Sequence, residues 1–356
     1  MDDPDASESL GKADRDLFES AIYPNLGADR ADVPLGPTHG VDFGVLDVGG
    51  RALVTATDPL SVLPDLGYER AGRFALAFAL ADVAVSGVAP THICPSFALP
   101  TGVSDDEFAA LWTAISDECR ELGVAVATGH TARYPGASFP WVGAATVLGV
   151  GDHDAVVRPD GARPGDRLLV TKGPAVETAG LLTTLYPEAF DALAESTLRE
   201  AQACLDRVGV TRDALAAAEA GREATPDGAV GGVTAMHDAT EGGLRGALCE
   251  TAAAAGVRFD VESAAVPEIP AAVAACDALG IDPWACTTSG TLVVAARPAA
   301  ADAVASALET RGTPVGVVGE VREGAGVYVD GGRVDPPAED PSWAAYEALS
   351  RRTPSG

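Results

Sequence analysis

The sequence predicts an α+β fold built from two domains, and three observations lead to this prediction. A chain of 356 residues is long enough to enclose two hydrophobic cores of ordinary size. The first half reads as β-rich with two helices, whereas the second half alternates strands with helices. The proline- and glycine-rich segment 159–167 separates the halves as a linker would. We therefore expect an acidic segment at 1–35, domains at 36–158 and 163–335, and a tail at 336–356.

Hydrophobic periodicity and capping residues predict the elements of the first half. An apolar helix is expected from about Glu69 to Ser86, because Gly87 and then Pro90 follow it. Ser104 and Glu107 have the spacing of a capping box, which starts a second helix that ends at Gly123. A short helix is expected near 14–21, and strands are expected near 43–48, 51–57, 91–98, 124–128 and 141–150.

The second half shows the same signals in an alternating order. Helices are expected near 175–185, 188–220, 270–279 and 298–310, and one more runs from the turn at Asp238 to about Ala255. Strands are expected near 168–171, 257–261, 291–296 and 314–321. Residues 221–233 are rich in glycine, so we expect them to be mobile. This alternation indicates an α/β second domain.

Asp82 is the first candidate functional residue. It is a single carboxylate near the end of the apolar helix, and the apolar run before that helix finishes at Asp58-Pro59. An ionised carboxylate among apolar residues needs an ion pair, hydrogen bonds or a metal ion. Two interpretations stay open: a ligand-binding aspartate, or a helix-terminal aspartate bonded to local backbone.

Two glycine-containing turns are further candidates. Asp238 and Thr240 precede Gly242-Gly243 at the start of a small-residue helix, and free amide groups at such a helix start suit a phosphate. A β-rich run also breaks into 129–131, Gly-His-Thr, at a strand end that could face a ligand. Either turn is also compatible with ordinary chain reversal. His39 and His237 flank these motifs, and we assign them no chemistry.

Lys172 is one of only two lysines, the other being Lys12. Its position at a strand end before a Gly-Pro turn suits a point charge on phosphate. An exposed surface lysine is the equal alternative. Glu177 follows in the first turn of the next helix, where the helix dipole stabilises an acid; a substrate role is the less favoured interpretation.

The composition restricts the partners and the compartment. The formal net charge is −28, which disfavours nucleic acid and anionic membranes as partners. Because acidic residues are spread along the chain and lysine is scarce, we favour adaptation to a salt-rich cytoplasm over a surface for a basic partner. The N-terminal sequence has no signal-peptide pattern, and no apolar run is long enough to span a membrane, so a cytoplasmic location is expected.

Taken in order, these motifs resemble the superfamily of aminoimidazole ribonucleotide synthetase. Its relatives include the hydrogenase-maturation carbamoyl dehydratase, selenophosphate synthetase and thiamine-monophosphate kinase. The resemblance covers roughly residues 36–330, and the segment 266–296 is most similar to the hydrogenase-maturation branch. The residues that carry it are Asp42, Thr57-Asp58, Asp82 with 86–90, Gly129-His130-Thr131, and Asp238 to Leu244.

The resemblance implies a fold, cofactors and site residues. It implies a two-domain aminoimidazole ribonucleotide synthetase-like fold, in which the first sheets of two chains pair into a dimeric β-barrel and the second domain is an α/β sandwich. It implies ATP and Mg²⁺ as cofactors. The implied metal ligands are Asp42, Asp58 and Asp82, and the implied nucleotide-binding residues are Gly129, His130, Thr131, Lys172, Asp238, Thr240, Gly242 and Gly243.

Some residues depart from the family pattern and leave the reaction open. His130 replaces the usual aspartate of its turn, Ser289 stands where the dehydratase branch tends to have glutamate, and no cysteine follows Cys286 to carry the dehydratase substrate. The first expectation is therefore phosphoryl transfer from ATP to an oxygen of an unidentified small molecule by a homodimer. The alternatives are a hydrogenase-maturation-type accessory protein that binds nucleotide and acts on a partner protein, and a thiamine-monophosphate kinase-like enzyme.

Overall fold

The structure is a computed structural model that describes residues 15–38, 40–225 and 231–352. Its first sheet has the strand order β1-β2-β6-β3-β4, and β5 also pairs with β3. β4 and β5 run parallel to β3, and the other pairs are antiparallel. The bounds are β1 Gly44–Val48, β2 Arg51–Ser61, β3 Pro90–Leu99, β4 Ala125–Val126, β5 His130–Arg133 and β6 Trp141–Gly151.

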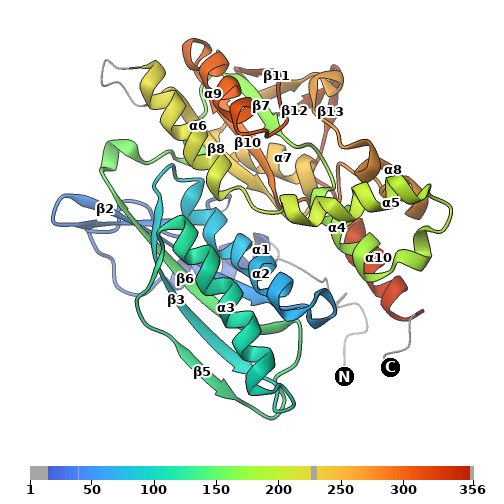
Figure 1. Cartoon of the computed structure of the whole chain (residues 1–356). Coiled ribbons are helices and arrows are strands. Elements are labelled where there is room, and N and C mark those ends of the chain that lie inside the picture. Colours follow the sequence, from blue (N-terminus) through green and yellow to red (C-terminus); the bar gives the residue numbers. More distant parts are fainter. Residues whose placement is uncertain (1–14, 39, 226–230, 353–356) are drawn as a thin grey trace, which may run out of the picture.

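Helices α2 (Tyr68–Ala84) and α3 (Asp105–Leu122) lie together on one face of this sheet (Figure 1). The predicted capping box is confirmed, because Glu107 N donates to Ser104 Oγ at 3.2 Å and Ser104 N donates to Glu107 Oε2 at 2.8 Å. Gly72 lets the two helices approach closely, since a Cβ there would lie 2.7 Å from the Leu111 carbonyl oxygen. The close contact holds α2 in the position that presents Asp82.

The second sheet has seven strands in the order β13-β12-β9-β11-β7-β10-β8, so β8 is an edge strand. All its pairs are antiparallel except β12 with β9. The bounds are β7 Arg167–Thr171, β8 Val233–Ala239, β9 Arg258–Val261, β10 Thr291–Ala296, β11 Val315–Arg322, β12 Gly326–Val329 and β13 Gly332–Val334.

Helices flank the second sheet on both faces. α6 and α9 pack against each other on one face, and α7 lies on the other (Figure 1). α4, α5, α8 and α10 share a separate hydrophobic cluster. The bounds are α4 Val176–Leu185, α5 Glu195–Gln202, α6 Thr211–Ala224, α7 Gly243–Ala255, α8 Pro270–Leu279, α9 Pro298–Thr310 and α10 Pro341–Ser350.

The two halves share one continuous core. The hydrophobic cluster that fills the space between the first sheet and α2 continues through Ala214 and Ala217 of α6 to Leu169 and Leu292 of the second sheet. α2 and α6 are in direct contact. This shared core fixes the ends of the two sheets relative to each other, which matters for a site built from both.

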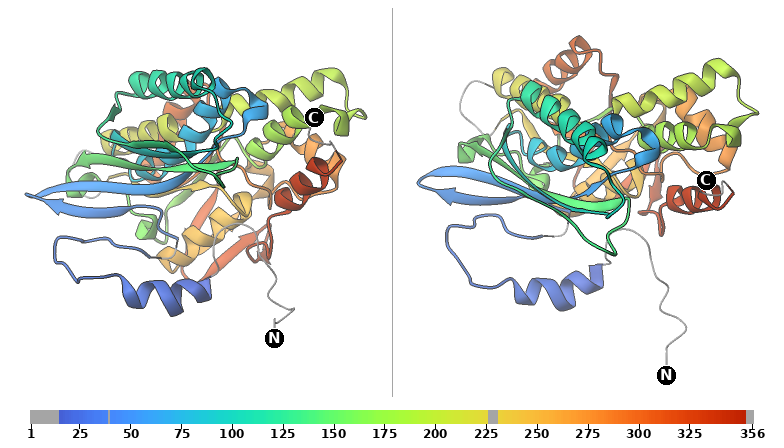
Figure 2. Two further views of the ribbon diagram at one scale, coloured as in Figure 1. Left: turned by 90° about the horizontal axis from the view of Figure 1, so that it is seen from below. Right: turned by 60° about the horizontal axis from the view of Figure 1, so that its bottom comes forward.

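Residues 15–34 lie beside this body. Figure 2 shows α1 (Arg15–Leu17) and the following helical turns at Phe18–Ile22 and Tyr23–Asn25 apart from the two sheets. None of residues 16–34 is buried. Further short helical turns are Pro64–Leu66, His153–Ala155, Pro159–Gly161, Pro187–Phe190, Ala203–Arg207 and Ser263–Ala265.

The α+β class with two sheets is confirmed, but several sequence expectations need correction. β2 does not end at Asp58-Pro59: Asp58 pairs with Ala145 and the strand continues to Ser61, because proline is tolerated where its missing N–H is not needed for the ladder. Of the segment 221–233 that we expect to be mobile, residues 221–224 belong to α6 and Val233 begins β8, and residues 226–230 lie outside the described residues. The tail contains α10, whose Leu349 is buried.

Candidate functional site

A cluster of three potential metal ligands joins the two halves of the chain. Asp42 lies just before β1, and His237 and Asp238 are consecutive residues of β8. Their ligand atoms all lie within 4.8 Å of one another, and within the described part of the chain this is the one such group of three or more. His237 and Asp238 are successive strand residues, so their side chains face opposite sides of the sheet. Because β8 is an edge strand, Asp42 can approach both side chains from beyond the edge of the sheet.

His237 is the most enclosed member of the cluster, with a side chain that is 2% exposed. Its Nε2–H donates to Glu250 Oε2 of α7 at 2.9 Å. Its Nδ1 lies 2.8 Å from Asp42 Oδ2, so the ring stands between two carboxylates.

The pKa of His237 reflects its charged neighbours. Burial lowers this pKa, but the carboxylates of Asp42 and Glu250 together outweigh the burial and hold it well above the ordinary histidine value. In the absence of another cation the ring is therefore an imidazolium between two carboxylates. The position demands positive charge, which a proton or a metal ion supplies.

The other two predicted metal ligands stand outside this cluster. Asp58 is half-buried within β2, and Asp82 is half-buried in the last turn of α2 rather than enclosed by apolar side chains. Each has further polar interactions in the structure. The cluster thus brings Asp42 together with Asp238, whereas a metal role for Asp58 and Asp82 stays a prediction.

The predicted phosphate turn before α7 already has protein acceptors. Gly242 N donates to Asp340 Oδ2 at 2.8 Å, and Gly243 N donates to the Thr240 carbonyl oxygen at 3.0 Å. Gly243 is required sterically, because its φ is +62° and a Cβ would lie 2.4 Å from the Cys286 carbonyl oxygen. A phosphate would therefore reach the Gly242 amide only by displacing the carboxylate of Asp340.

The segment Gly129-His130-Thr131 is exposed at the edge of the first sheet, where Thr131 pairs with Phe97. Gly129 is explained by packing, since a Cβ there would lie 2.7 Å from the Pro95 carbonyl oxygen. His130 Nε2 lies 3.2 Å from the Tyr134 hydroxyl. The turn is open to a ligand, and its nucleotide-binding role remains a prediction.

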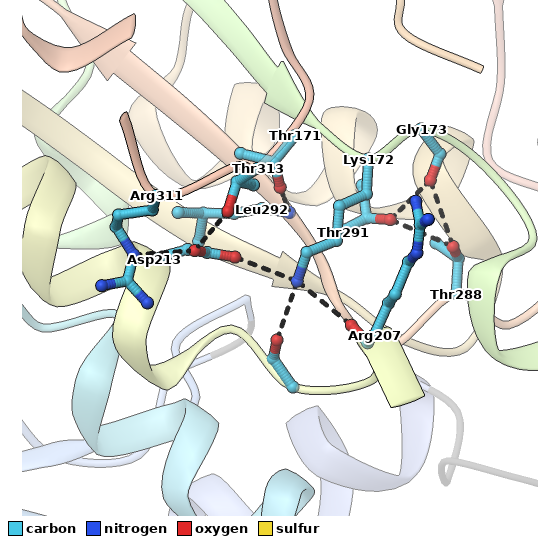
Figure 3. Close-up of polar contacts among 11 residues, drawn as sticks. Thr171, Lys172, Gly173, Arg207, Asp213, Thr288, Thr291, Leu292, Arg311 and Thr313 are labelled. Carbon is cyan, nitrogen blue, oxygen red and sulfur yellow. Dashed lines mark hydrogen bonds and ion pairs between the residues drawn. The ribbon is translucent and has the colours of Figure 1, made fainter. Parts of the chain in front are cut away.

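Lys172 is not the surface lysine of our second interpretation, because its side chain is 9% exposed. Its ammonium group donates to Asp213 Oδ2 at 2.9 Å and to the carbonyl oxygens of Gly209 and Arg207 at 3.0 and 3.1 Å (Figure 3). An ammonium has three N–H donors, and each has a protein oxygen. Lys172 therefore ties the loop before α6 to the end of β7.

A cavity of about 1250 Å³ lies beside this lysine, between α2, α3 and the loop 205–213. Several cationic side chains line it, but carboxylates pair with them: Arg212 with Glu118 at 2.7 Å, and Arg311 with Asp213 at 3.3 Å. The walls are largely balanced in charge. Of the predicted site residues, only Lys172 lines this cavity.

Glu177 is buried at the start of α4, where its Oε2 accepts a hydrogen bond from Ser289 N at 3.2 Å. Burial raises the pKa of this carboxyl to about 7, and the nearby acids Asp340 and Glu241 add to the rise. Ser289 Oγ is buried as well and has no hydrogen-bond partner among the described residues. The carboxyl group of Glu177 thus lies beside Ser289. Ser289 is the position at which the dehydratase branch tends to have glutamate.

Sequence reasoning missed three participants. His237 was given no chemistry, although its place directly before Asp238 at a strand end was a usable signal. Glu250 lies thirteen residues later, on α7, and it contacts the imidazole of His237 only because α7 packs against β8. The sequence does not show this packing. Asp340 lies in the tail, where it caps the start of α10. Nothing in the sequence indicates that its carboxylate also accepts a hydrogen bond from the Gly242 amide.

No helix within the described ranges is both long enough and apolar enough to cross a membrane.

Comparison with known proteins gives the family. The chain matches "AIR synthase related protein, N-terminal domain" over residues 40–150 and "AIR synthase related protein, C-terminal domain" over residues 163–332. Carbamoyl dehydratase HypE of Cupriavidus necator is 31% identical over 282 residues, which are 77% of this chain and 74% of that protein. Selenide, water dikinase of Geobacter sp. (strain M21) is 30% identical over 279 residues, 76% of this chain and 72% of that protein.

Solved structures show the same fold. AaThiL complexed with AMPPCP and TMP has a TM-score of 0.69 at 19% identity and covers 92% of this chain and 98% of its own. HypE in complex with ATP has a TM-score of 0.65 at 24% identity and covers 94% of this chain and 97% of its own. The resemblance inferred from the motifs is confirmed, and this chain belongs to the AIR synthase related family.

Proposed function

We propose that this protein is an ATP-binding enzyme that uses a divalent cation to transfer a phosphoryl group to an oxygen of a small molecule. The observation that carries the proposal is the cluster of Asp42, His237 and Asp238, which lies at the junction of the two sheets and directly before the turn into α7. Family membership supports it, since a solved structure of the same fold holds ATP and another holds AMPPCP.

The donor set fits a divalent cation. The carboxylates of Asp42 and Asp238 are hard oxygen ligands of the kind that Mg²⁺ takes, and a ring nitrogen of His237 lies within 4.8 Å of both. A cation held there would neutralise phosphate charge, and charge neutralisation with positioning is most of what phosphoryl transfer needs. Asp58 and Asp82 are proposed to complete the set with the nucleotide bound.

The start of α7 is proposed to hold a phosphate. The positive end of the helix dipole and the Gly242 amide already attract an anion, the carboxylate of Asp340. We propose that a nucleotide phosphate takes over this amide while Asp340 withdraws with the tail. Thr240 precedes the turn and is proposed to contact the same phosphate, and the exposed turn 129–131 is proposed to contact the nucleotide from the first sheet.

A homodimer is proposed to cover the outer face of the first sheet. The side chains of Trp141 and Val150 on β6 are 54% and 46% exposed, and Val48 at the end of β1 is 57% exposed. Exposed apolar side chains on one sheet, together with its open edge strands, are features that a second copy would cover.

A hydrogenase-maturation-type accessory role is the second candidate. It is favoured by the 31% identity to a protein named carbamoyl dehydratase. A thiamine-monophosphate kinase-like activity is supported by the fold only.

ADP release with a panel of phosphate-ester, carboxylate and amide acceptors in molar KCl tests the first proposal. We expect one acceptor class to accelerate ADP release, and we expect Asp238→Asn to lose most of this acceleration. Tight ATP binding with no ADP released by any acceptor would favour the accessory role instead.

A further inference from the structure

Another cavity, of about 610 Å³, lies where the linker between the two halves meets α6, the start of β8 and the residue after β10. Thr234 of β8 lines this cavity, whereas Asp42, His237 and Asp238 do not. Thr234 and Asp238 are four residues apart on one strand, which places the cavity roughly 13 Å from the cluster along β8. The cavity is therefore separate from the site proposed for ATP.

The arginines of this cavity differ from most others in the chain. Acidic residues outnumber lysine and arginine by 52 to 24, so an arginine readily finds a carboxylate partner. Among the arginines whose side chains the structure describes, five form no ion pair with a carboxylate, namely Arg163, Arg207, Arg222, Arg297 and Arg352. Three of these five, Arg163, Arg222 and Arg297, line the cavity.

The carboxylates of the cavity do not neutralise these three arginines. Asp160 is paired with a fourth arginine, Arg158, at 2.8 Å. Asp166 is 4% exposed, and its Oδ2 accepts from Thr234 Oγ1 at 2.7 Å and from a backbone amide of the linker at 2.8 Å. Asp154 is exposed to solvent. The cavity thus keeps uncompensated positive charge in a chain whose net charge is −28.

The three guanidinium groups come from three different segments and retain free donors. Arg163 of the linker donates from Nη1 to two carbonyl oxygens of its own loop at 2.9 and 3.0 Å, and its Nε and Nη2 have no acceptor among the described residues. Arg222 in the last turn of α6 donates from Nη1 to the Gly87 carbonyl oxygen at 3.4 Å, which is a long hydrogen bond. The Arg297 side chain, directly after β10, forms no hydrogen bond within the described part of the chain.

We propose that this cavity binds a small organic phosphate through Arg163, Arg222 and Arg297. A guanidinium group presents its N–H donors as a fork that matches the oxygens of a phosphate group. A phosphate monoester offers three strong acceptor oxygens, so three guanidinium groups from three segments can each bond to it.

The size and the walls of the cavity indicate that the phosphate carries an organic group. The volume of about 610 Å³ falls within the range of roughly 300–1000 Å³ that is typical of small-molecule sites. Val157, Ala218 and Val233 contribute apolar contacts from the segment before the linker, from α6 and from β8. These walls suit a compact apolar group attached to the phosphate.

Calorimetric titration with inorganic phosphate and with phenyl phosphate, in constant molar KCl, tests the proposal. Chloride is then in large excess, so only a specific phosphate site is detected. We expect one phenyl phosphate per chain, bound more tightly than inorganic phosphate. Arg222→Gln and Arg297→Gln should each weaken this binding about tenfold or more, because each removes hydrogen bonds to a charged group.

Two control variants locate the binding. Arg207→Gln removes a guanidinium group that also lacks an ion pair but lines the cavity beside Lys172, so phenyl phosphate affinity should not change. Asp42→Asn should also bind phenyl phosphate like the wild-type protein, whatever its affinity for ATP. Loss of phenyl phosphate binding in either control would place the phosphate elsewhere and overturn the proposal.

The wild-type titration decides the proposal even if an arginine variant does not fold. No phosphate site in the wild-type protein would overturn it, as would unchanged affinity in Arg222→Gln and Arg297→Gln whose melting temperatures show that they are folded. Equal affinity for inorganic phosphate and phenyl phosphate would overturn the assignment of an organic ligand. None of these outcomes bears on whether ATP binds at the Asp42–Asp238 cluster.

Discussion

Substitutions in the buried ion pair of Lys172 and Asp213 test whether Lys172 has a structural role or binds phosphate. Asp213 Oδ2 accepts from Lys172 at 2.9 Å, and its Oδ1 accepts from Thr313 Oγ1 at 2.8 Å and from Arg311 Nε at 3.3 Å (Figure 3). The side chains of the pair are 9% and 7% exposed. Asp213→Asn would leave the ammonium group in the interior without a counter-charge, which costs about 3–5 kcal/mol.

Lys172→Met should cost less than Asp213→Asn, because Arg311 and Thr313 continue to satisfy the remaining carboxylate. The double variant Lys172→Met/Asp213→Leu should cost less than the sum of its single changes, since no unpaired charge then stays buried. Urea unfolding in constant molar KCl measures all three. The matched control is Arg212→Ala, which breaks an exposed pair with Glu118 and should cost at most about 1 kcal/mol.

Two results would refute this reasoning. A loss of unfolding free energy below about 1 kcal/mol for Asp213→Asn would mean that the pair contributes no more than an exposed ion pair. Full stability of Lys172→Met together with a large loss of ATP affinity would instead restore Lys172 to the phosphate site.

Four further predictions follow from charge, burial and exposure. Burial raises the pKa of Glu177 from 4.5 to about 7, so its contribution to stability is complete below pH 4.5 and is lost as the pH rises through 7. The free energy of unfolding of Glu177→Gln should lack this loss of roughly 3 kcal/mol. Equal pH dependence of the unfolding free energy in the two proteins would contradict this prediction. Because salt screens the repulsion within a chain of net charge −28, the melting temperature should rise from dilute buffer to molar KCl. A melting temperature that stays flat or falls would favour the other interpretation of the charge, a surface for a basic partner. Light scattering in molar salt should give the mass of a dimer, and a monomer would remove the proposed cover of the first sheet. Asp82→Asn should keep its melting temperature yet weaken magnesium-dependent ATP binding, whereas lower stability with unchanged affinity would make Asp82 a structural helix residue.

The sequence predicted elements where local signals decide them. The capping box at Ser104 and the αL glycine at Gly123 define α3 without tertiary contacts, and the observed α3 agrees with the expectation. Asp58 shows the limit: proline after it suggested a strand end, but pairing with β6 carries β2 on to Ser61. Tertiary packing overrides a local breaker there.

The site was less predictable than the fold, because its contacts join distant segments. Asp42 and Asp238 were each identified from motifs, but only the packing of the 40–42 segment along the edge of the second sheet brings them together. Gly40 belongs to this contact, since a Cβ there would lie 3.5 Å from the Glu250 carbonyl oxygen. Two of the three acceptors of Lys172 are backbone carbonyls more than thirty residues away, and no side-chain pattern in the sequence encodes those two contacts.

Binding of ATP at the Asp42–Asp238 cluster is the central claim, and calorimetric titration of ATP into the wild-type and Asp42→Asn proteins tests it most directly. The titrations are run in molar KCl, with a divalent cation and with a chelator. We predict that one ATP binds per wild-type chain with the cation, that the chelator weakens binding strongly, and that Asp42→Asn binds weakly under both conditions while its melting temperature shows that it is folded. ATP binding that is equally tight with the chelator and in folded Asp42→Asn would contradict the claim.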